Sequence, residues 1–273
     1  MVSIATSVIQ AAEQVAARAG LVPSHFATPF VVVGGPRTGS TLLQRQINSH
    51  PNIVCMHEVL KGTSGVAAFS RQFLGRRGSL LDLRRRDMPS FIRALLTTRQ
   101  PLRIAALGFK AMFVHPEGET EWLQAWETLS SISGLRVIWI DRNPIDSVLS
   151  FALARSAGAW VSKPVRTSIE LDPSWVVRRL ELEKRQAMRA AVSLSGSEVL
   201  RISYKDLAGR IGCTMSQVFR FLGAKPTDLQ PALEKQDRGS FRTMIRNFDQ
   251  VVAHLEGSSW AEALSHSDAV RLN

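Results

Sequence analysis

The residues from Phe30 to Leu43 constrain the fold more than any other part of the chain. They read Phe-Val-Val-Val-Gly-Gly-Pro-Arg-Thr-Gly-Ser-Thr-Leu-Leu. The three valines form a β-branched apolar run typical of a buried parallel strand, and the glycines permit a tight turn. Ser40 and Thr41 then begin a helix, whose unpaired N–H groups and positive dipole end attract an anion. This stretch therefore predicts a strand, an anion-binding loop and a helix.

The loop differs from a nucleotide-binding P-loop in the position of its cation. In that pattern a Lys precedes the final Ser or Thr, whereas here Ser40 stands in its place and Arg37 lies inside the loop. A P-loop Lys reaches the β- and γ-phosphates of ATP or GTP, so its absence weakens a kinase interpretation. A nucleotide with another terminal group fits better. A glycine-rich turn without a ligand is the alternative.

A second motif follows another apolar strand, 137–141. It reads Arg142-Asn-Pro-Ile-Asp-Ser-Val-Leu-Ser150. Asn143 is a favourable N-cap and Pro144 a favourable first helical residue. Arg142 stands at the carboxyl end of the strand, where open α/β sheets bind ligands. A well-capped helix with an exposed Arg and Ser is the alternative interpretation.

Together the two motifs resemble those of sulfotransferases that use 3′-phosphoadenosine-5′-phosphosulfate (PAPS). The loop resembles their 5′-phosphosulfate loop, and every fixed position of their 3′-phosphate motif Arg-Asn-Pro-x-Asp-x-x-x-Ser is matched. Other segments resemble bacterial carbohydrate and glycolipid sulfotransferases, among them the rhizobial Nod-factor sulfotransferase. The resemblance extends from about residue 28 to 260. These other segments are 50–58, 107–110, 203–207 (with Lys205 in place of the usual Glu), 236–239 and 244–249.

The resemblance implies PAPS as co-substrate, no metal, and a role for each matched residue. Arg37 stabilises charge on the leaving oxygen, and Lys110 contacts the sulfuryl group or the bridging oxygen. Arg142 and Ser150 hold the 3′-phosphate, and Tyr204 lies near the adenine. The implied donor-binding residues are Pro36, Arg37, Thr38, Gly39, Ser40, Thr41, Arg142, Ser150, Tyr204 and Arg238.

An acceptor hydroxyl needs a general base, because its own pKa lies far above 7. The resemblance gives this role to Glu58. We expect nearby cations to keep its carboxylate ionised, while partial burial raises its pKa. Steroid and phenol sulfotransferases use a His two positions after the Lys, and Met112 stands there. The alternative bases are His115 and His57, the latter expected to point away from Glu58 because neighbours on an extended segment face opposite sides.

The charge balance favours polyanionic partners. Lys and Arg total 34 against 23 Asp and Glu, a net charge of +11. Nucleic acid is not expected, because neither zinc-ligand spacing nor aromatic-interleaved basic strands are present. Two cysteines make no disulfide framework, and neither a signal peptide nor an apolar stretch of membrane-spanning length is found. The six His show no paired metal-ligand spacing. We expect a cytoplasmic protein without a metal site.

Strand and helix patterns alternate, which predicts a three-layer α/β fold of the P-loop type with a mostly parallel sheet. We expect a helical extension at 1–26 and a sulfotransferase domain at 27–273. The arginine-rich region 59–103, interpreted as irregular, is expected to bind the acceptor or form a lid; a solvated basic face and peripheral membrane contact are the alternatives. Strands are predicted at 30–34, 104–109, 136–141 and 198–203, and helices at 40–49, 119–130, 144–157, 174–193 and 214–222.

The leading hypothesis is transfer of the sulfuryl group of PAPS to a hydroxyl of a carbohydrate or glycolipid, by in-line displacement with Glu58 as base. An atypical P-loop kinase is the second hypothesis, for which Asp141 is the candidate Mg²⁺ ligand. The third is a non-catalytic nucleotide-binding protein of the same fold. The identity of the acceptor and the oligomeric state stay open.

Overall fold

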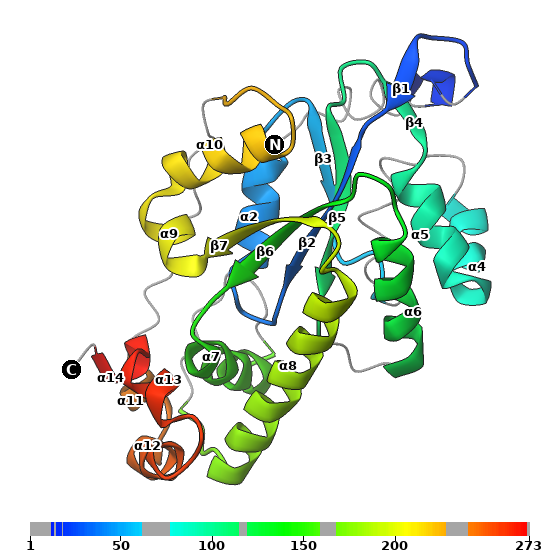
Figure 1. Ribbon diagram of the computed structural model, residues 1–273. Coiled ribbons are helices and arrows are strands. Elements are labelled where there is room, and N and C mark those ends of the chain that lie inside the picture. Colours follow the sequence, from blue (N-terminus) through cyan, green and yellow to red (C-terminus); the bar gives the residue numbers. More distant parts are fainter. Residues whose placement is uncertain are drawn as a thin grey trace.

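A five-stranded parallel sheet lies at the centre of the protein in the computed structural model (Figure 1). Its strand order is β3-β5-β2-β6-β7, and Val32 on the central strand lies between Lys110 and Ile138 on its neighbours. The strands are β2 (Thr28–Gly34), β3 (Ile53–Met56), β5 (Ala106–Met112), β6 (Arg136–Asp141) and β7 (Glu198–Ser203). The structure describes residues 12–61 except 14 and 18, and residues 77–114, 119–158, 168–227 and 240–271.

Helices cover both faces of the sheet (Figure 1). One face packs against α2 (Ser40–Ile47), α9 (Tyr204–Gly209) and α10 (Ile211–Phe221). The other packs against α4 (Arg77–Arg86), α5 (Met88–Leu96), α6 (Glu119–Ser130) and the end of α8 (Pro173–Ser193). The remaining elements are α7 (Pro144–Ser156), α11 (Phe241–Met244), α12 (Phe248–Glu256), α13 (Ala261–Ser265), α14 (Asp268–Arg271) and a small antiparallel sheet of β1 (Ser24–Phe26) and β4 (Arg99–Pro101).

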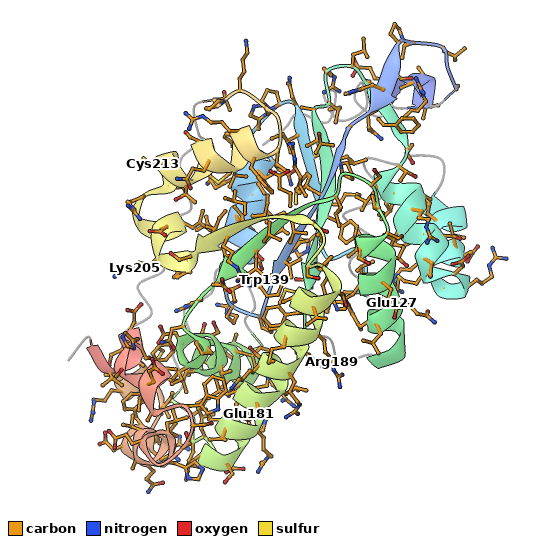
Figure 2. The ribbon with its side chains drawn as sticks, in the orientation of Figure 1. Glu127, Trp139, Glu181, Arg189, Lys205 and Cys213 are labelled. Atoms are coloured by element: carbon orange, nitrogen blue, oxygen red, sulfur yellow. The ribbon has the colours of Figure 1, made fainter. Side chains whose placement is uncertain are left out.

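The valine run in β2 explains why the sheet is covered on both sides. Successive strand side chains point to opposite faces, so Val31 and Val33 join one apolar cluster while Phe30 and Val32 join the other. All four are fully buried. Figure 2 shows side chains filling the space between the sheet and the helices on both sides. The three-layer α/β fold with a parallel sheet is confirmed.

A third apolar cluster joins α7 and α8 to the C-terminal helices α11–α14. Asn143 caps α7 as predicted, since its side-chain oxygen accepts the Ile145 N–H at 2.9 Å. Its amide also donates to the Ala263 carbonyl at 2.7 Å. Asp146 is buried and accepts the Ser267 hydroxyl at 2.5 Å. The second motif therefore anchors the C-terminal helices, which the sequence did not predict.

The stretch between Glu58 and Lys110 is more regular than expected. It contains α4, α5 and β4, and Phe91, Ile92 and Leu95 of α5 are fully buried in the core. The interpretation of this whole stretch as irregular was wrong, because an apolar helix face is hidden among its arginines. The short strand β3 was also missed. The predicted strands and helices recur, with the predicted ends for β6, β7 and α6 and with shifted ends for the others.

The domain boundaries at 1–26, 27–273 and 59–103 stay predictions. The extension and the arginine-rich region lie partly outside the described residues. Wholly outside them lie Arg71 and Arg76 of the arginine-rich region, the alternative base His115 and the donor-binding candidate Arg238. Within the described ranges, no helix combines the length and apolar character that a membrane crossing needs.

Candidate active site

The loop between β2 and α2 is closely packed, and neighbouring atoms leave no room for a Cβ atom at Gly34 or Gly39. A Cβ atom on Gly34 would lie 2.7 Å from Ile140 Cγ2 on the neighbouring strand. Gly39 has φ 90°, in the left-handed region that favours glycine, and a Cβ there would lie 2.5 Å from Tyr204 Cδ2. Arg37 also adopts positive φ, 62°, which is uncommon for a residue with a side chain. The loop thus follows a path that few other sequences could adopt.

The N-terminus of α2 carries no side-chain cap. Gly39 is the N-cap residue, and the first turn contains no acidic side chain. Thr38, which could have served as a cap, donates its hydroxyl to the Gly35 carbonyl at 2.8 Å and closes the loop instead. The N–H groups that begin a helix need an acceptor. At this end of α2 an anionic ligand can supply it.

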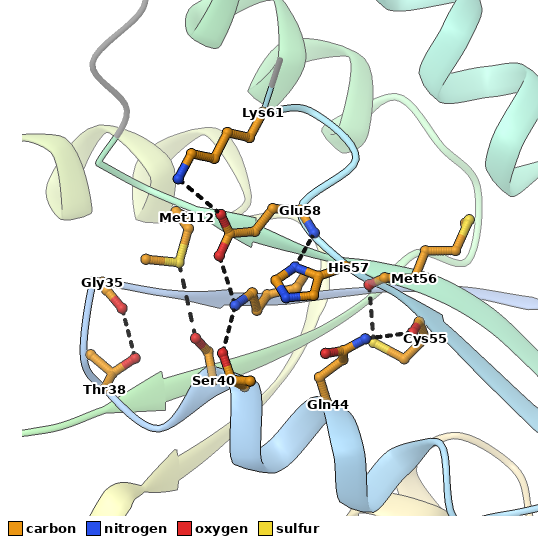
Figure 3. Close-up of polar contacts among 12 residues, drawn as sticks. Gly35, Thr38, Ser40, Gln44, Cys55, Met56, His57, Glu58, Lys61 and Met112 are labelled. Carbon is orange, nitrogen blue, oxygen red and sulfur yellow. Dashed lines mark hydrogen bonds and ion pairs between the residues drawn. The ribbon is translucent and has the colours of Figure 1, made fainter. Parts of the chain in front are cut away.

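Lys110 and Glu58 meet at the same end of α2, and Figure 3 labels Glu58 above this helix end. Lys110 is only 2% exposed, and its ammonium lies 3.0 Å from the Thr41 hydroxyl and 2.7 Å from Glu58 Oε1. The other carboxylate oxygen, Oε2, lies 3.7 Å from the Lys61 ammonium. A buried cation and a carboxylate therefore lie side by side where the loop would bind an anion.

The pKa of Glu58 moves in the direction opposite to the one expected from burial. Burial raises the pKa of this carboxyl, but Lys110 in direct contact, together with Lys61 and His57, outweighs it and holds the pKa below its ordinary value. The expected rise of this pKa through partial burial is corrected, because two ammonium groups lie within ion-pair distance, while the expectation that cations keep the carboxylate ionised agrees with the lowered pKa. In this state Glu58 is ionised at neutral pH.

His57 does not point away from Glu58. The chain turns after β3, with the Val59 N–H donating to the His57 carbonyl at 2.7 Å. The His57 ring accepts the Glu58 backbone N–H at Nδ1, 2.7 Å away. Burial, and then the charge of Lys110, lower the pKa of His57, so its imidazole is neutral at physiological pH. The expectation of opposite faces was wrong because the segment is a turn rather than a strand.

The second motif lies against the loop. Arg37 Nε donates to Ser150 Oγ at 3.2 Å, and Arg142 Nη1 donates to the Arg37 carbonyl at 2.9 Å. The Arg142 guanidinium also stacks over the Tyr204 ring, 4.6 Å from its centroid. The buried Nε atom of Arg142 has no hydrogen-bond partner among the described residues. Because a buried donor is rarely left unpaired, this atom fits a site that binds an anion.

The structure thus brings most of the predicted donor-binding residues to one edge of the sheet. The exception is Arg238, which lies outside the described residues. Sequence reasoning missed Lys61, whose position three residues after Glu58 becomes a contact only through the turn. The residues that gather around the loop are Pro36, Arg37, Thr38, Gly39, Ser40, Thr41, Glu58, Lys110, Arg142, Ser150 and Tyr204.

Asp141, the candidate Mg²⁺ ligand of a kinase, is engaged elsewhere. Its Oδ1 accepts the indole N–H of Trp139 at 2.7 Å, and its Oδ2 pairs with Arg201 at 3.2 Å. No cluster of three His, Cys, Asp or Glu side chains suited to a metal ion occurs in the described part of the chain. The contacts of Asp141 therefore give the kinase hypothesis no support.

The family model for the sulfotransferase family matches residues 29–228, from the start of β2 to just beyond α10. The chain therefore belongs to the sulfotransferase family. It is 25% identical to nodulation protein H of Rhizobium tropici over 247 residues, which cover 88% of this chain and 94% of that protein. It is also 25% identical to nodulation protein H of Rhizobium meliloti (strain 1021), with 85% and 93% covered.

Solved structures of sulfotransferases also align with this chain. One, from Alicyclobacillus acidocaldarius, aligns with a TM-score of 0.46 and 16% identity over 84% of this chain and 94% of that one. A mouse sulfotransferase complexed with PAP aligns with a TM-score of 0.41 and 12% identity, covering 94% and 95% of the two chains.

Proposed function

We propose that this sulfotransferase moves the sulfuryl group of PAPS to a hydroxyl of a carbohydrate or glycolipid acceptor, with Glu58 as general base. The observation that carries the proposal is the contact of Lys110 with both Thr41 and Glu58 at the uncapped N-terminus of α2. It joins an anion-binding helix end, a buried cation and a carboxylate within one hydrogen-bonded group. The similarity to nodulation protein H supports the acceptor class.

The donor would lie across the two motifs. The uncapped N–H groups of α2 and the loop would bind the 5′-phosphosulfate end, and Arg142 and Ser150 would hold the 3′-phosphate. Tyr204 would lie near the adenine, with its ring already against the loop at Gly39. The unpaired Nε atom of Arg142 supports this assignment, since a phosphate oxygen would satisfy it.

The reaction would be an in-line displacement at sulfur. The acceptor hydroxyl gives its proton to Glu58 while its oxygen bonds to sulfur, and the bond from sulfur to the phosphate oxygen breaks. Arg37 and Lys110 stabilise the charge that develops on the leaving oxygen, as cations do in phosphoryl transfer. The products are the sulfated acceptor and 3′-phosphoadenosine-5′-phosphate (PAP).

A transfer assay with [³⁵S]PAPS and a panel of oligosaccharides and glycolipids tests this function. We expect label to move to at least one hydroxyl-bearing acceptor, with PAP released in equal amount and without added Mg²⁺. In parallel, [γ-³²P]ATP with Mg²⁺ is offered to the same panel. Transfer of phosphate from ATP, with none of sulfate from PAPS, would contradict the proposal and favour the kinase hypothesis.

A further inference from the structure

The Glu58 carboxylate is held by two lysines that bind different oxygens. Lys110 lies 2.7 Å from Oε1, and Lys61 lies 3.7 Å from Oε2. The two lysines also differ in environment, because the side chain of Lys110 is 2% exposed whereas that of Lys61 is 49% exposed. Figure 3 shows Lys61 reaching Glu58 from the side away from α2. Lys110 is therefore a buried cation of the site, and Lys61 is a partly exposed cation at its surface.

The two lysines cannot have the same relation to the donor. Lys110 also contacts Thr41, so its ammonium is within reach of an anion at the N-terminus of α2. A sulfuryl or phosphate oxygen bound there would compete with Glu58 for this ammonium, because both are acceptors for the same N–H groups. Among the described residues, the Lys61 side chain has no hydrogen bond or ion pair to the loop or α2. Its contact with Oε2 is the one that donor binding leaves in place.

We propose that Lys61 is a positioning residue that holds Glu58 by Oε2 once the donor draws Lys110 away, so that Oε1 receives the acceptor proton. This inference rests on the proposed function. The other titratable group facing the carboxylate is His57, whose Nδ1 accepts the Glu58 N–H, whose ring is neutral at neutral pH, and whose charge when protonated also lowers the pKa of Glu58. With Lys110 engaged by the donor and His57 neutral at neutral pH, Lys61 is the cation in the described structure that remains in ion-pair contact with Glu58.

The test is the pH dependence of PAPS hydrolysis without an added acceptor, measured as PAP release. Water takes the place of the hydroxyl and gives its proton to Glu58 as its oxygen bonds to sulfur. Activity falls at acid pH as Glu58 becomes protonated. Removing a cation raises the pKa of a carboxyl, so Lys61→Met should move the acid limb upward by about half a pH unit. Donor affinity should not change, and Lys61→Arg should restore the wild-type profile.

Lys225→Met is the matched control. It removes the same charge from an exposed side chain, and only the backbone carbonyl of Lys225 makes a described contact, with His50. Its acid limb should coincide with that of the wild type. The proposal is overturned if the Lys61→Met profile coincides with those of the wild type and Lys225→Met.

A direct titration separates this inference from the proposed function. Carbon-13 NMR of the Glu carboxyls, with Glu58→Gln to assign the signal, reports the pKa of Glu58 with and without PAPS. We expect PAPS to raise this pKa, and Lys61→Met to raise it further. An equal pKa in Lys61→Met and wild type overturns the role of Lys61. Failure to bind PAPS at all would instead overturn the proposed function, while the titration of the protein alone still tests the Lys61 contact.

Discussion

The two halves of the candidate site use their polar side chains in different ways. In the first half, Lys110 binds both Thr41 and Glu58, and the described hydrogen bonds and ion pairs of these side chains include none to the C-terminal helices. In the second half, Asn143 and Asp146 bind the C-terminal helices. The polar side chains of the first half therefore form a charged group at the candidate site, whereas several of those in the second half stabilise the fold.

The difference shows that a contiguous motif need not be a contiguous site. Of the Arg-Asn-Pro-x-Asp-x-x-x-Ser motif, only Arg142 and Ser150 contact the loop, through the carbonyl and the guanidinium of Arg37. The Asn and Asp fix the helix that carries them. We therefore expect substitutions in the first half to affect turnover, those of Asn143 and Asp146 to affect folding, and that of Arg142 to affect donor binding.

The largest expected effect is that of Glu58→Gln. Loss of a general base lowers the rate by about 10²–10⁴-fold, and the amide keeps the shape of the side chain. PAP binding should persist, because Glu58 contacts Lys110 rather than the expected phosphate groups. Steady-state sulfuryl transfer and PAP calorimetry on the same preparation measure both properties.

Glu198→Gln is the matched control for this change. Glu198 is an exposed glutamate of β7 that pairs with Arg136 at 3.1 Å, far from the loop in sequence and outside the predicted site. It should keep wild-type turnover. Full activity in Glu58→Gln would contradict the role of Glu58 as general base.

A smaller effect, on stability, is expected from Asp146→Ala. The buried carboxylate accepts the Ser267 hydroxyl and the backbone N–H groups of Asp268 and Ala269. Their loss leaves buried donors unpaired and should lower the free energy of unfolding by about 2–3 kcal/mol. Chemical denaturation of the variant and the wild type measures this change in the free energy of unfolding.

Asp268→Ala is the control for that loss. The side chain of Asp268 is exposed, and its backbone N–H, which contacts Asp146, is retained. The change in unfolding free energy should stay within about 0.5 kcal/mol. If Asp146→Ala lowered the free energy of unfolding no more than Asp268→Ala does, Asp146 would not have the structural role assigned to it. The shift of half a pH unit expected for Lys61→Met is the smallest of these effects.

Local patterns predicted the part of the fold that local residues determine. The strand, loop and helix from β2 to α2 follow from the valines, glycines and hydroxyl residues of one segment. The cap of α7 likewise follows from Asn143 and Pro144. The C-terminal helices could not be found this way, because α11, α13 and α14 have only four or five residues. Their burial depends on α7 and α8, which are far away in sequence.

The site was predicted as a set of residues but not as an arrangement. The contact between Thr41, Glu58 and Lys110 joins three segments that the sheet order β3-β5-β2 brings together. The turn that brings His57 and Lys61 to Glu58 depends on backbone hydrogen bonds after β3. The lowered pKa of Glu58 follows from that arrangement. Residue types alone predicted an ionised carboxylate, but not that the charge of the lysines would outweigh burial.

Calorimetric titration with PAP and with ATP, each with and without Mg²⁺, tests most directly whether the two motifs form one donor site. We predict metal-independent binding of PAP, tighter than that of ATP. Arg142→Ala should weaken it by about 10- to 100-fold, the value of a hydrogen bond to a charged group. Arg201→Ala, which removes an arginine stacked on Trp139 outside the site, should leave it unchanged. Tighter binding of ATP with Mg²⁺, or wild-type PAP affinity in Arg142→Ala, would contradict the assignment.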